Sequence, residues 1–127
     1  MWEGFTFHSS SSLATRLTFP LGFHSLGRRT SASSRVGYWY REHTSTTQTP
    51  ILFVHGIGIG FYTYGSFLGD LNSGSRDGDG VGIIALELTS ISSRISAEAP
   101  SALEVKDEVE KILEHHGWHD IVLVGHS

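Results

Sequence analysis

The sequence contains no cysteine, which excludes disulfides, thiolate metal ligands and a thiol nucleophile. It also has no apolar run that approaches the ~20 residues of a membrane-spanning helix. Positive charge is scarce, because nine Lys and Arg stand against 13 Asp and Glu, for a formal net charge of -4. Such a chain offers no broad basic surface, so we expect no nucleic-acid partner.

What the chain does contain suits one compact domain: 127 residues, of which 39% are hydrophobic. From Val36 onward, strand and helix signals alternate, which predicts an α/β fold with a largely parallel sheet. We therefore divide the chain into an N-terminal arm, 1–35, and a folded domain, 36–127.

The arm is rich in Ser, Thr and Arg, and the stretch from Phe5 to Arg35 has no acidic residue. This is the composition of an organellar transit peptide. The alternative is a loosely packed arm whose Leu17–Phe23 segment (LTFPLGF) anchors it on the domain or on a lipid surface. We expect an intracellular protein without a transmembrane segment, with organellar targeting and peripheral membrane contact left open.

Four apolar segments predict strands. The aromatic segment at 36–41 is expected to be an outer strand, and the continuous run ILFV between Pro50 and Gly56 a central strand buried on both faces. The four predicted strands are Val36–Arg41, Ile51–Val54, Val81–Leu88 and Ile121–Val124.

Two segments predict helices. Apolar residues recur at helical spacing between Phe61 and Asn72, and the turn formers at 73–80 then predict an exposed loop. A longer helix follows Pro100, where Ser101 and Glu104 form a capping box, and Gly117 stops it in the left-handed conformation. Its expected apolar stripe is Val105, Val109, Ile112, Leu113 and His116; its expected solvated residues are Glu104, Lys106, Asp107, Glu108 and Lys111.

The residues that could carry chemistry follow two of the predicted strands. His55, Gly56, Ile57 and Gly58 come after ILFV, and Gly125-His126-Ser127 comes after IVLV. A serine exposed on a sharp turn after a strand can attack an acyl carbon if a histidine base and an orienting carboxylate stand beside it. A bend of glycines can bring backbone N–H groups close to the reacting oxygen.

At these positions the sequence resembles the α/β-hydrolase superfamily of serine esterases and lipases, over the range Val36–Ser127. The resemblance implies the N-terminal half of such a domain: a mainly parallel central sheet flanked by helices and truncated at the nucleophile elbow. It also implies cleavage of an ester or related acyl bond, in a small or lipid-like substrate, through an acyl-serine intermediate. No cofactor is implied.

The same resemblance assigns the site residues. Ser127 matches the nucleophile, the N–H of Ile57 matches an oxyanion donor, and Gly56 and Gly58 permit the turn. His55 is a structural residue of that turn. A serine, rather than an aspartate, at the nucleophile position argues against the dehalogenase and epoxide-hydrolase branches.

The family pattern is incomplete. Only Gly125, His126 and Ser127 of the G-x-S-x-G elbow are present, and family members place the acid and then the histidine after the serine. None of the eight histidines matches the base position, so we expect this chain to be inactive by itself. The alternative is a non-catalytic remnant or interaction module, whose cut sheet would leave an apolar edge.

Other site types fit less well. A dinucleotide loop would need its third glycine where Phe61 or Thr63 stands, so Glu87 is taken as a helix cap or an exposed strand end instead of a ribose-binding acid. The carboxylates of Asp77 and Asp79 suit a solvated turn. His115 and His116 suit a helix C-terminus better than a zinc site, and we predict no metal site.

Overall fold

The computed structural model describes residues 4–9, 29–33, 35–56, 63–71, 79–88 and 101–126. The predicted 17–23 anchor, most of the predicted 73–80 loop with Asp77, and the site residues Ile57, Gly58 and Ser127 lie outside this part of the chain. Among the described helices, none is long and apolar enough to cross a membrane.

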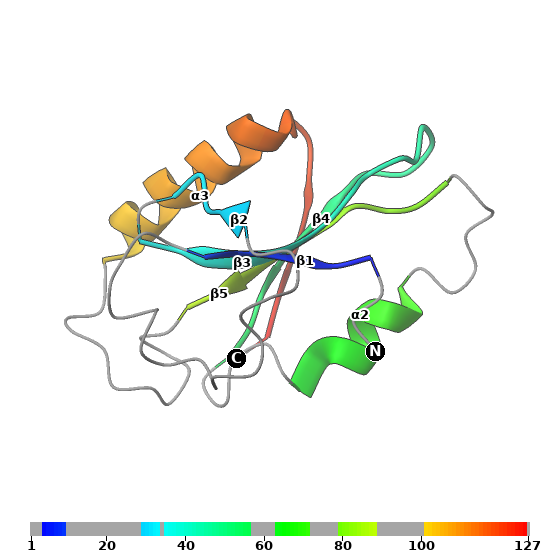
Figure 1. The fold of residues 1–127 in the computed structure, drawn as a ribbon, viewed down its shortest axis with the longest axis horizontal. Coiled ribbons are helices and arrows are strands. Elements are labelled where there is room, and N and C mark those ends of the chain that lie inside the picture. Colours follow the sequence, from blue (N-terminus) through cyan, green and yellow to red (C-terminus); the bar gives the residue numbers. More distant parts are fainter. Residues whose placement is uncertain are drawn as a thin grey trace.

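The described chain forms an α/β fold around one sheet, with strand order β2-β1-β3-β5-β4-β6 (Figure 1). The strands are β1 (Thr6–Ser9), β2 (Arg29–Thr30), β3 (Gly37–Arg41), β4 (Ile51–Val54), β5 (Ile83–Glu87) and β6 (Val122–Gly125). The four predicted strands are thus confirmed as β3, β4, β5 and β6. In addition, β1 and β2 come from the segment 1–35, so parts of that segment belong to the same sheet.

The prediction of a mainly parallel sheet is wrong, because the sheet is mixed. Strand β3 runs antiparallel to both β1 and β5, whereas β4 runs parallel to both β5 and β6. Strands and helices alternate from β4 onward, but the described residues between β3 and β4 form no helix. A parallel crossover needs roughly a dozen or more residues, and the stretch 42–50 before β4 is too short for one. Nor is β3 an outer strand, since it lies between β1 and β5.

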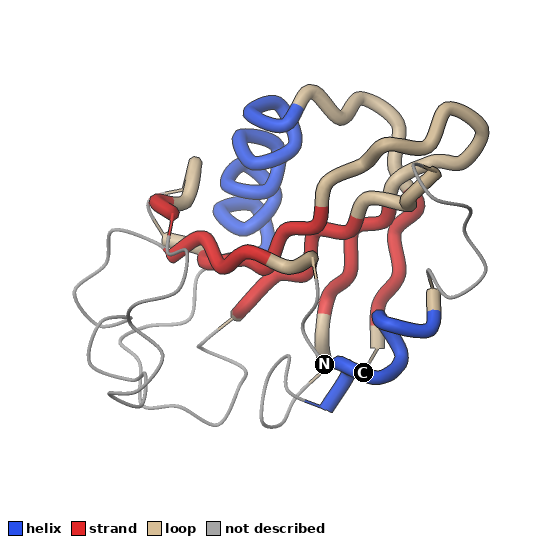
Figure 2. Tube along the Cα trace, turned by 45° about the vertical axis from the view of Figure 1, so that its right-hand side comes forward, coloured by secondary structure: helices blue, strands red, loops and turns tan. Residues whose placement is uncertain are grey.

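The two described helices lie on opposite faces of the sheet (Figures 1 and 2). The chain passes from β4 through α2 (Gly65–Asp70) to one neighbour of β4, and from β5 through α3 (Ala102–His116) to the other neighbour. Because such crossovers are right-handed, connections that run in opposite directions place their helices on opposite faces.

Each face of the sheet has its own core. On the α3 face the buried cluster is Val36, Tyr38, Leu52, Ile84, Leu86, Ile112 and Trp118. On the α2 face it is Phe53, Leu68, Ile83 and Ala85. Strand β5 contributes to both clusters and is buried throughout, including Glu87, so the prediction of an exposed strand end there is wrong.

Helix α2 is a short helix within the predicted range, and its apolar face is covered only in part. Leu68 is fully buried, but Phe67 is 47% exposed and Leu71 is 36% exposed. Periodicity predicted a helix here. The helix has only six residues, which is less than two turns, so only a small part of the predicted apolar face lies against the sheet.

The ends of α3 confirm the sequence prediction. The hydroxyl of Ser101 accepts a hydrogen bond from the Glu104 N–H, and the Glu104 carboxylate accepts one from the Ser101 N–H. The hydrogen bond from the Ser101 N–H, with further contributions from the Ser101 side chain and Arg35, holds the pKa of the Glu104 carboxyl below its usual value. At the other end Gly117 has φ 71, the left-handed conformation that a residue without a Cβ adopts at low cost.

One residue of α3 differs from its prediction. Glu108 was expected to be solvated but is buried, because Ser33 and Lys111 contact its carboxylate. The Ser33 hydroxyl donates to Glu108 Oε2 at 2.5 Å, and Lys111 Nζ lies 2.7 Å from Oε1. The same Ser33 oxygen accepts the Val36 N–H, so the segment before β3 is attached to α3. Sequence periodicity could not reveal a partner so distant in the chain.

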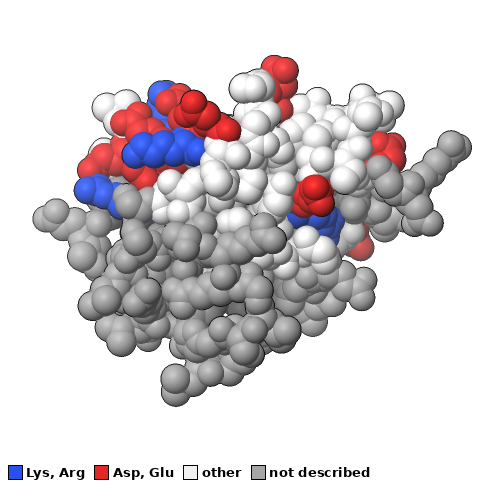
Figure 3. Space-filling model, turned by 45° about the horizontal axis from the view of Figure 1, so that its top comes forward, with Lys and Arg blue, Asp and Glu red and all other residues white. Residues whose placement is uncertain are grey.

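The outer face of α3 carries charges of both signs, which gather over this helix in Figure 3. Lys106 pairs with Glu110 at 2.6 Å, and Arg35 pairs with Glu104 at 2.8 Å. Both pairs are exposed and therefore contribute little stability, but they keep this surface solvated.

Candidate functional site

The two sequence motifs meet at one edge of the sheet. Strands β4 and β6 are parallel neighbours, with Val54 paired to Gly125, and the His126 N–H donates to the Val54 carbonyl at 3.1 Å. The chain therefore leaves both strands side by side, at the carboxyl edge where open α/β sheets place their ligands.

His55 holds the turn after β4 against the end of β5. Its side chain is 1% exposed. Its Nε2 accepts the Leu88 N–H at 3.0 Å, while its Nδ1 donates to the Gly56 carbonyl at 2.9 Å. One nitrogen accepts and the other donates, so these contacts require the neutral ring with its hydrogen on Nδ1. Both nitrogens are occupied within the protein, which leaves His55 unavailable as a general base.

His126 contacts Tyr64, the residue that precedes α2. Its Nδ1 lies 2.8 Å from the Tyr64 hydroxyl, and its ring meets the Tyr64 ring edge to face at 5.6 Å between centroids. Tyr64 in turn packs against Phe53 of β4 at 4.9 Å. Sequence reasoning placed Tyr64 on an apolar helix face and missed this contact, since no local signal marks a tyrosine that pairs with a histidine 62 positions away.

Two described segments end at this site. Gly56 is buried at the end of the described turn, and His126 is the last described residue. The matched nucleophile Ser127 and the matched oxyanion donor Ile57 each come one residue further along the chain, outside the described residues. The structure thus brings the strands that carry the two motifs together and leaves the reacting atoms themselves undescribed.

A second group of ionisable side chains lies on the α3 face, and sequence reasoning did not find it. His8 stacks on Tyr38 with ring centroids 4.7 Å apart, and His116 stacks on Tyr40 at 4.0 Å. The Tyr38 hydroxyl lies 2.8 Å from His116 Nε2. The pairing of β1 with β3 brings His8 opposite Tyr38, and the packing of α3 on the sheet adds His116.

Burial governs the ionisation of this group. It raises the pKa of Tyr38 to about 12, and it lowers the pKa of His116 to about 4, with smaller contributions from the neighbouring His115 and His8. A histidine at a helix C-terminus normally gains positive charge more easily. Here desolvation outweighs the helix, so His116 is neutral at pH 7.

No family model matches the chain, and neither a curated protein nor a solved structure matches it. Within the described residues, no group of three or more His, Cys, Asp or Glu could hold a metal ion. The candidate site is the carboxyl edge of β4, β5 and β6, where the chain leaves the strands that precede both motifs.

Proposed function

We propose that this chain is the N-terminal portion of a serine hydrolase of the α/β-hydrolase type, which cleaves an ester or related acyl bond. Ser127 is the nucleophile and the N–H of Ile57 an oxyanion donor. The observation that carries the proposal is the pairing of Val54 with Gly125, because it sets the His-Gly turn and the Gly-His-Ser turn beside one another.

The crossover pattern supports the same location. The chain passes from β4 to its neighbour β5 on one side and then to β6 on the other side, so the order of strands reverses its direction at β4. A crevice forms at such a point in an open sheet, outside the carboxyl ends of the strands. An acyl substrate placed there would meet the serine from one strand and the backbone N–H from its neighbour.

The chemistry divides between the two turns. The Ser127 oxygen would add to the acyl carbon while a histidine base takes the hydroxyl proton. Collapse of the tetrahedral intermediate would break the bond to the leaving oxygen, which departs as the alcohol with that proton, and water would then hydrolyse the acyl-serine. The backbone N–H at Ile57 would stabilise the negative oxygen of the tetrahedral intermediate, a contact worth roughly 2.7 to 4 kcal/mol in such enzymes. His55 would hold this turn through its bond to Leu88 without touching the substrate.

The test is fluorophosphonate labelling of the protein made from the complete reading frame, with Ser127→Ala as the control. We expect covalent labelling at Ser127, together with hydrolysis of a short-chain p-nitrophenyl ester, and loss of both in the variant. The 127-residue chain by itself is expected to show no ester turnover above its own S127A variant, because the resemblance places the acid and the histidine base after the serine.

Two results would count against the proposal. One is labelling that persists in the S127A protein, which would place the reactive group elsewhere. The other is a complete reading frame whose product neither labels nor turns over esters while remaining folded.

That second result would favour a non-catalytic interaction module. The observation on its side is the exposed apolar strand β6, where Val122 is 47% exposed and Leu123 is 66% exposed. Sedimentation velocity of the purified protein distinguishes the two: an interaction module would associate through this strand whether or not Ser127 is present.

A further inference from the structure

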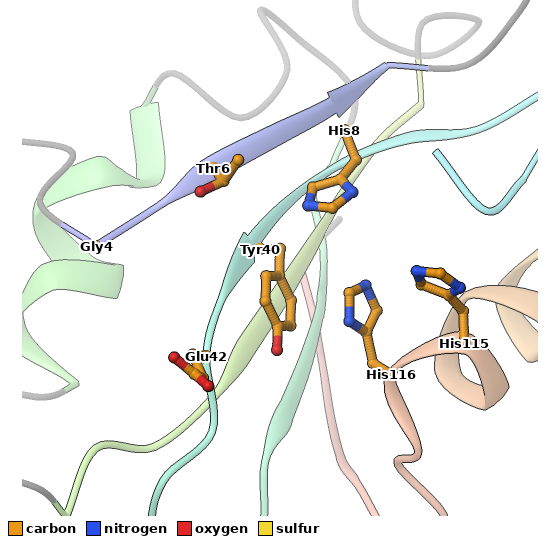
Figure 4. Close-up of a pocket in the computed structure, with 7 residues that line it drawn as sticks. All are labelled: Gly4, Thr6, His8, Tyr40, Glu42, His115 and His116. Atoms are coloured by element: carbon orange, nitrogen blue, oxygen red, sulfur yellow. The ribbon is translucent and has the colours of Figure 1, made fainter. Parts of the chain in front are cut away.

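A pocket of about 510 Å³ opens on the α3 face of the sheet, a size typical of small-molecule sites (Figure 4). Strand β1, the end of β3 and the last turn of α3 form it. Its lining residues are Gly4, Thr6, His8, Tyr40, Glu42, His115 and His116.

Strand pairing explains why these side chains share one face. Thr6 pairs with Tyr40 and His8 pairs with Tyr38, and alternate residues of a strand point to the same side. The intervening residues face the other way, where Arg41 lies over the Phe5 ring at 4.1 Å. Arg41 is not among the lining residues: its side chain passes beside Gly4, and its Nη1 donates to the Leu68 carbonyl of α2 at 3.4 Å.

The pocket lies at the opposite edge of the sheet from His55 and His126. Arg41, next to Tyr40, pairs with Ile83 at the start of β5, whereas His55 and His126 follow the ends of β4 and β6. It is therefore a site separate from the proposed active site, and it does not depend on the proposed function.

The charge of the pocket favours a cation. Glu42 is the one acidic side chain in the lining, and neither lysine nor arginine is among the lining residues. The C-terminal end of the 15-residue helix α3 adds the partial negative charge of its last carbonyl groups. His116 is neutral, because burial lowers its pKa to about 4, so it adds no opposing charge at pH 7.

We propose that this pocket binds the primary ammonium group of a small amine. Such a group has three N–H donors, and the lining offers three oxygen-bearing side chains as acceptors: the Glu42 carboxylate and the Thr6 and Tyr40 hydroxyls. A quaternary ammonium fits less well, since it needs open ring faces and the Tyr40 and His116 rings are stacked on one another. A metal ion fits less well too, because the described side chains form no three-ligand group.

The test is an NMR titration of the full chain near neutral pH with butylammonium chloride, alongside 1-butanol and tetramethylammonium chloride. We expect saturable shifts of the Thr6, His8 and His116 amide signals with butylammonium, and at least about tenfold weaker binding of the other two probes. Glu42→Gln should weaken butylammonium binding by a similar factor, and Thr6→Val by less.

Glu114→Gln is the matched control, since Glu114 is an exposed residue of α3 outside the pocket and loses the same charge. It should leave the affinity unchanged. The proposal is overturned if 1-butanol binds as tightly as butylammonium, if E42Q and E114Q behave alike, or if zinc chloride shifts the same signals at lower concentration than the amine.

Discussion

Strands β5 and β6 have similar apolar sequences but differ in how far they are buried. Both are apolar, both run parallel to β4, and each pairs with one side of it. All five residues of β5 are buried, whereas in β6 Leu123 is 66% exposed. Strand β5 has β3 on its other side and contributes to both cores. Within the described residues, β6 pairs with β4 alone.

The difference shows that burial depends on neighbours and not on hydrophobicity alone. IIALE and VLVG would both be read as strands covered on two faces. In the described part of the chain, only β5 of the two is paired on both sides, with β3 and β4, and is therefore shielded from solvent. The free energy that holds the fold should therefore be concentrated around β5, and changes in β6 should affect association more than folding.

The largest difference in the free energy of unfolding is expected when one large side chain in each strand is replaced by alanine. Ile84→Ala in β5 should lower the free energy of unfolding by roughly 3 kcal/mol, because it leaves a cavity at a fully buried position. Leu123→Ala in β6 should cost less than about 1 kcal/mol. Urea denaturation of both variants measures the difference, and equal losses would mean that β6 is as well covered as β5.

The second largest effect on stability is expected from the hydrogen bonds formed at the ends of these strands. His55→Ala removes the acceptor for the partly buried Leu88 N–H at the end of β5 and should cost roughly 2 kcal/mol. Tyr64→Phe removes the exposed contact to His126 at the end of β6 and should cost below about 0.5 kcal/mol. Thermal unfolding ranks the pair; a Tyr64 variant as unstable as the His55 variant would contradict this comparison.

A smaller effect on the free energy of unfolding is expected from His116, at the end of α3. Because the pKa of His116 falls from 6.5 to about 4 on folding, the fold favours the neutral ring. The stabilisation is complete above the unfolded value and is lost as the pH falls from 6.5 through about 4. After allowance for the partly exposed ring, it should amount to roughly 1 kcal/mol.

His116→Phe tests this effect, since phenylalanine keeps an aromatic ring on Tyr40 but cannot bind a proton. The free energy of unfolding of the variant, measured across the same pH range, should fall less steeply than that of the unmodified chain. An identical pH dependence in the two proteins would show that burial of His116 does not control it.

The smallest effect on stability is expected from Leu123→Lys. At a position already exposed it should change the free energy of unfolding by less than about 0.5 kcal/mol. A charge on an exposed strand discourages edge-to-edge pairing, so sedimentation velocity should show less self-association than in the unmodified chain. Leu103→Lys, a matched change at the exposed Leu103 of α3, is the control, and equal effects would remove any special role for β6.

Much of the fold could be predicted because its signals are local. The capping box at Ser101, the stop at Gly117 and the four strands after Val36 depend on neighbouring residues, and the structure confirms them. Strands β1 and β2 were not predicted, since a short mixture of polar and aromatic residues such as TFHS, in a Ser-rich segment, gives no strand signal by itself. Their strand form depends on pairing with β3 and with each other.

The candidate site was predictable as two motifs and not as one place. His-Gly after β4 and Gly-His-Ser after β6 were visible in the sequence. The contacts of His55 with Leu88 and of His126 with Tyr64 were not, because each joins residues more than 30 positions apart. The pocket with Glu42 was missed for the same reason.

The sequence by itself determined the order and approximate positions of the strands and helices after Val36, and both ends of α3, because caps, turns and apolar runs act over a few residues. It also determined that two glycine turns with a histidine and a serine follow apolar strands. The tertiary structure alone decided that β3 runs antiparallel, that β4 and β6 are neighbours, and that β5 is buried while β6 is exposed. These depend on which strands pair, and pairing is settled by contacts between distant parts of the chain.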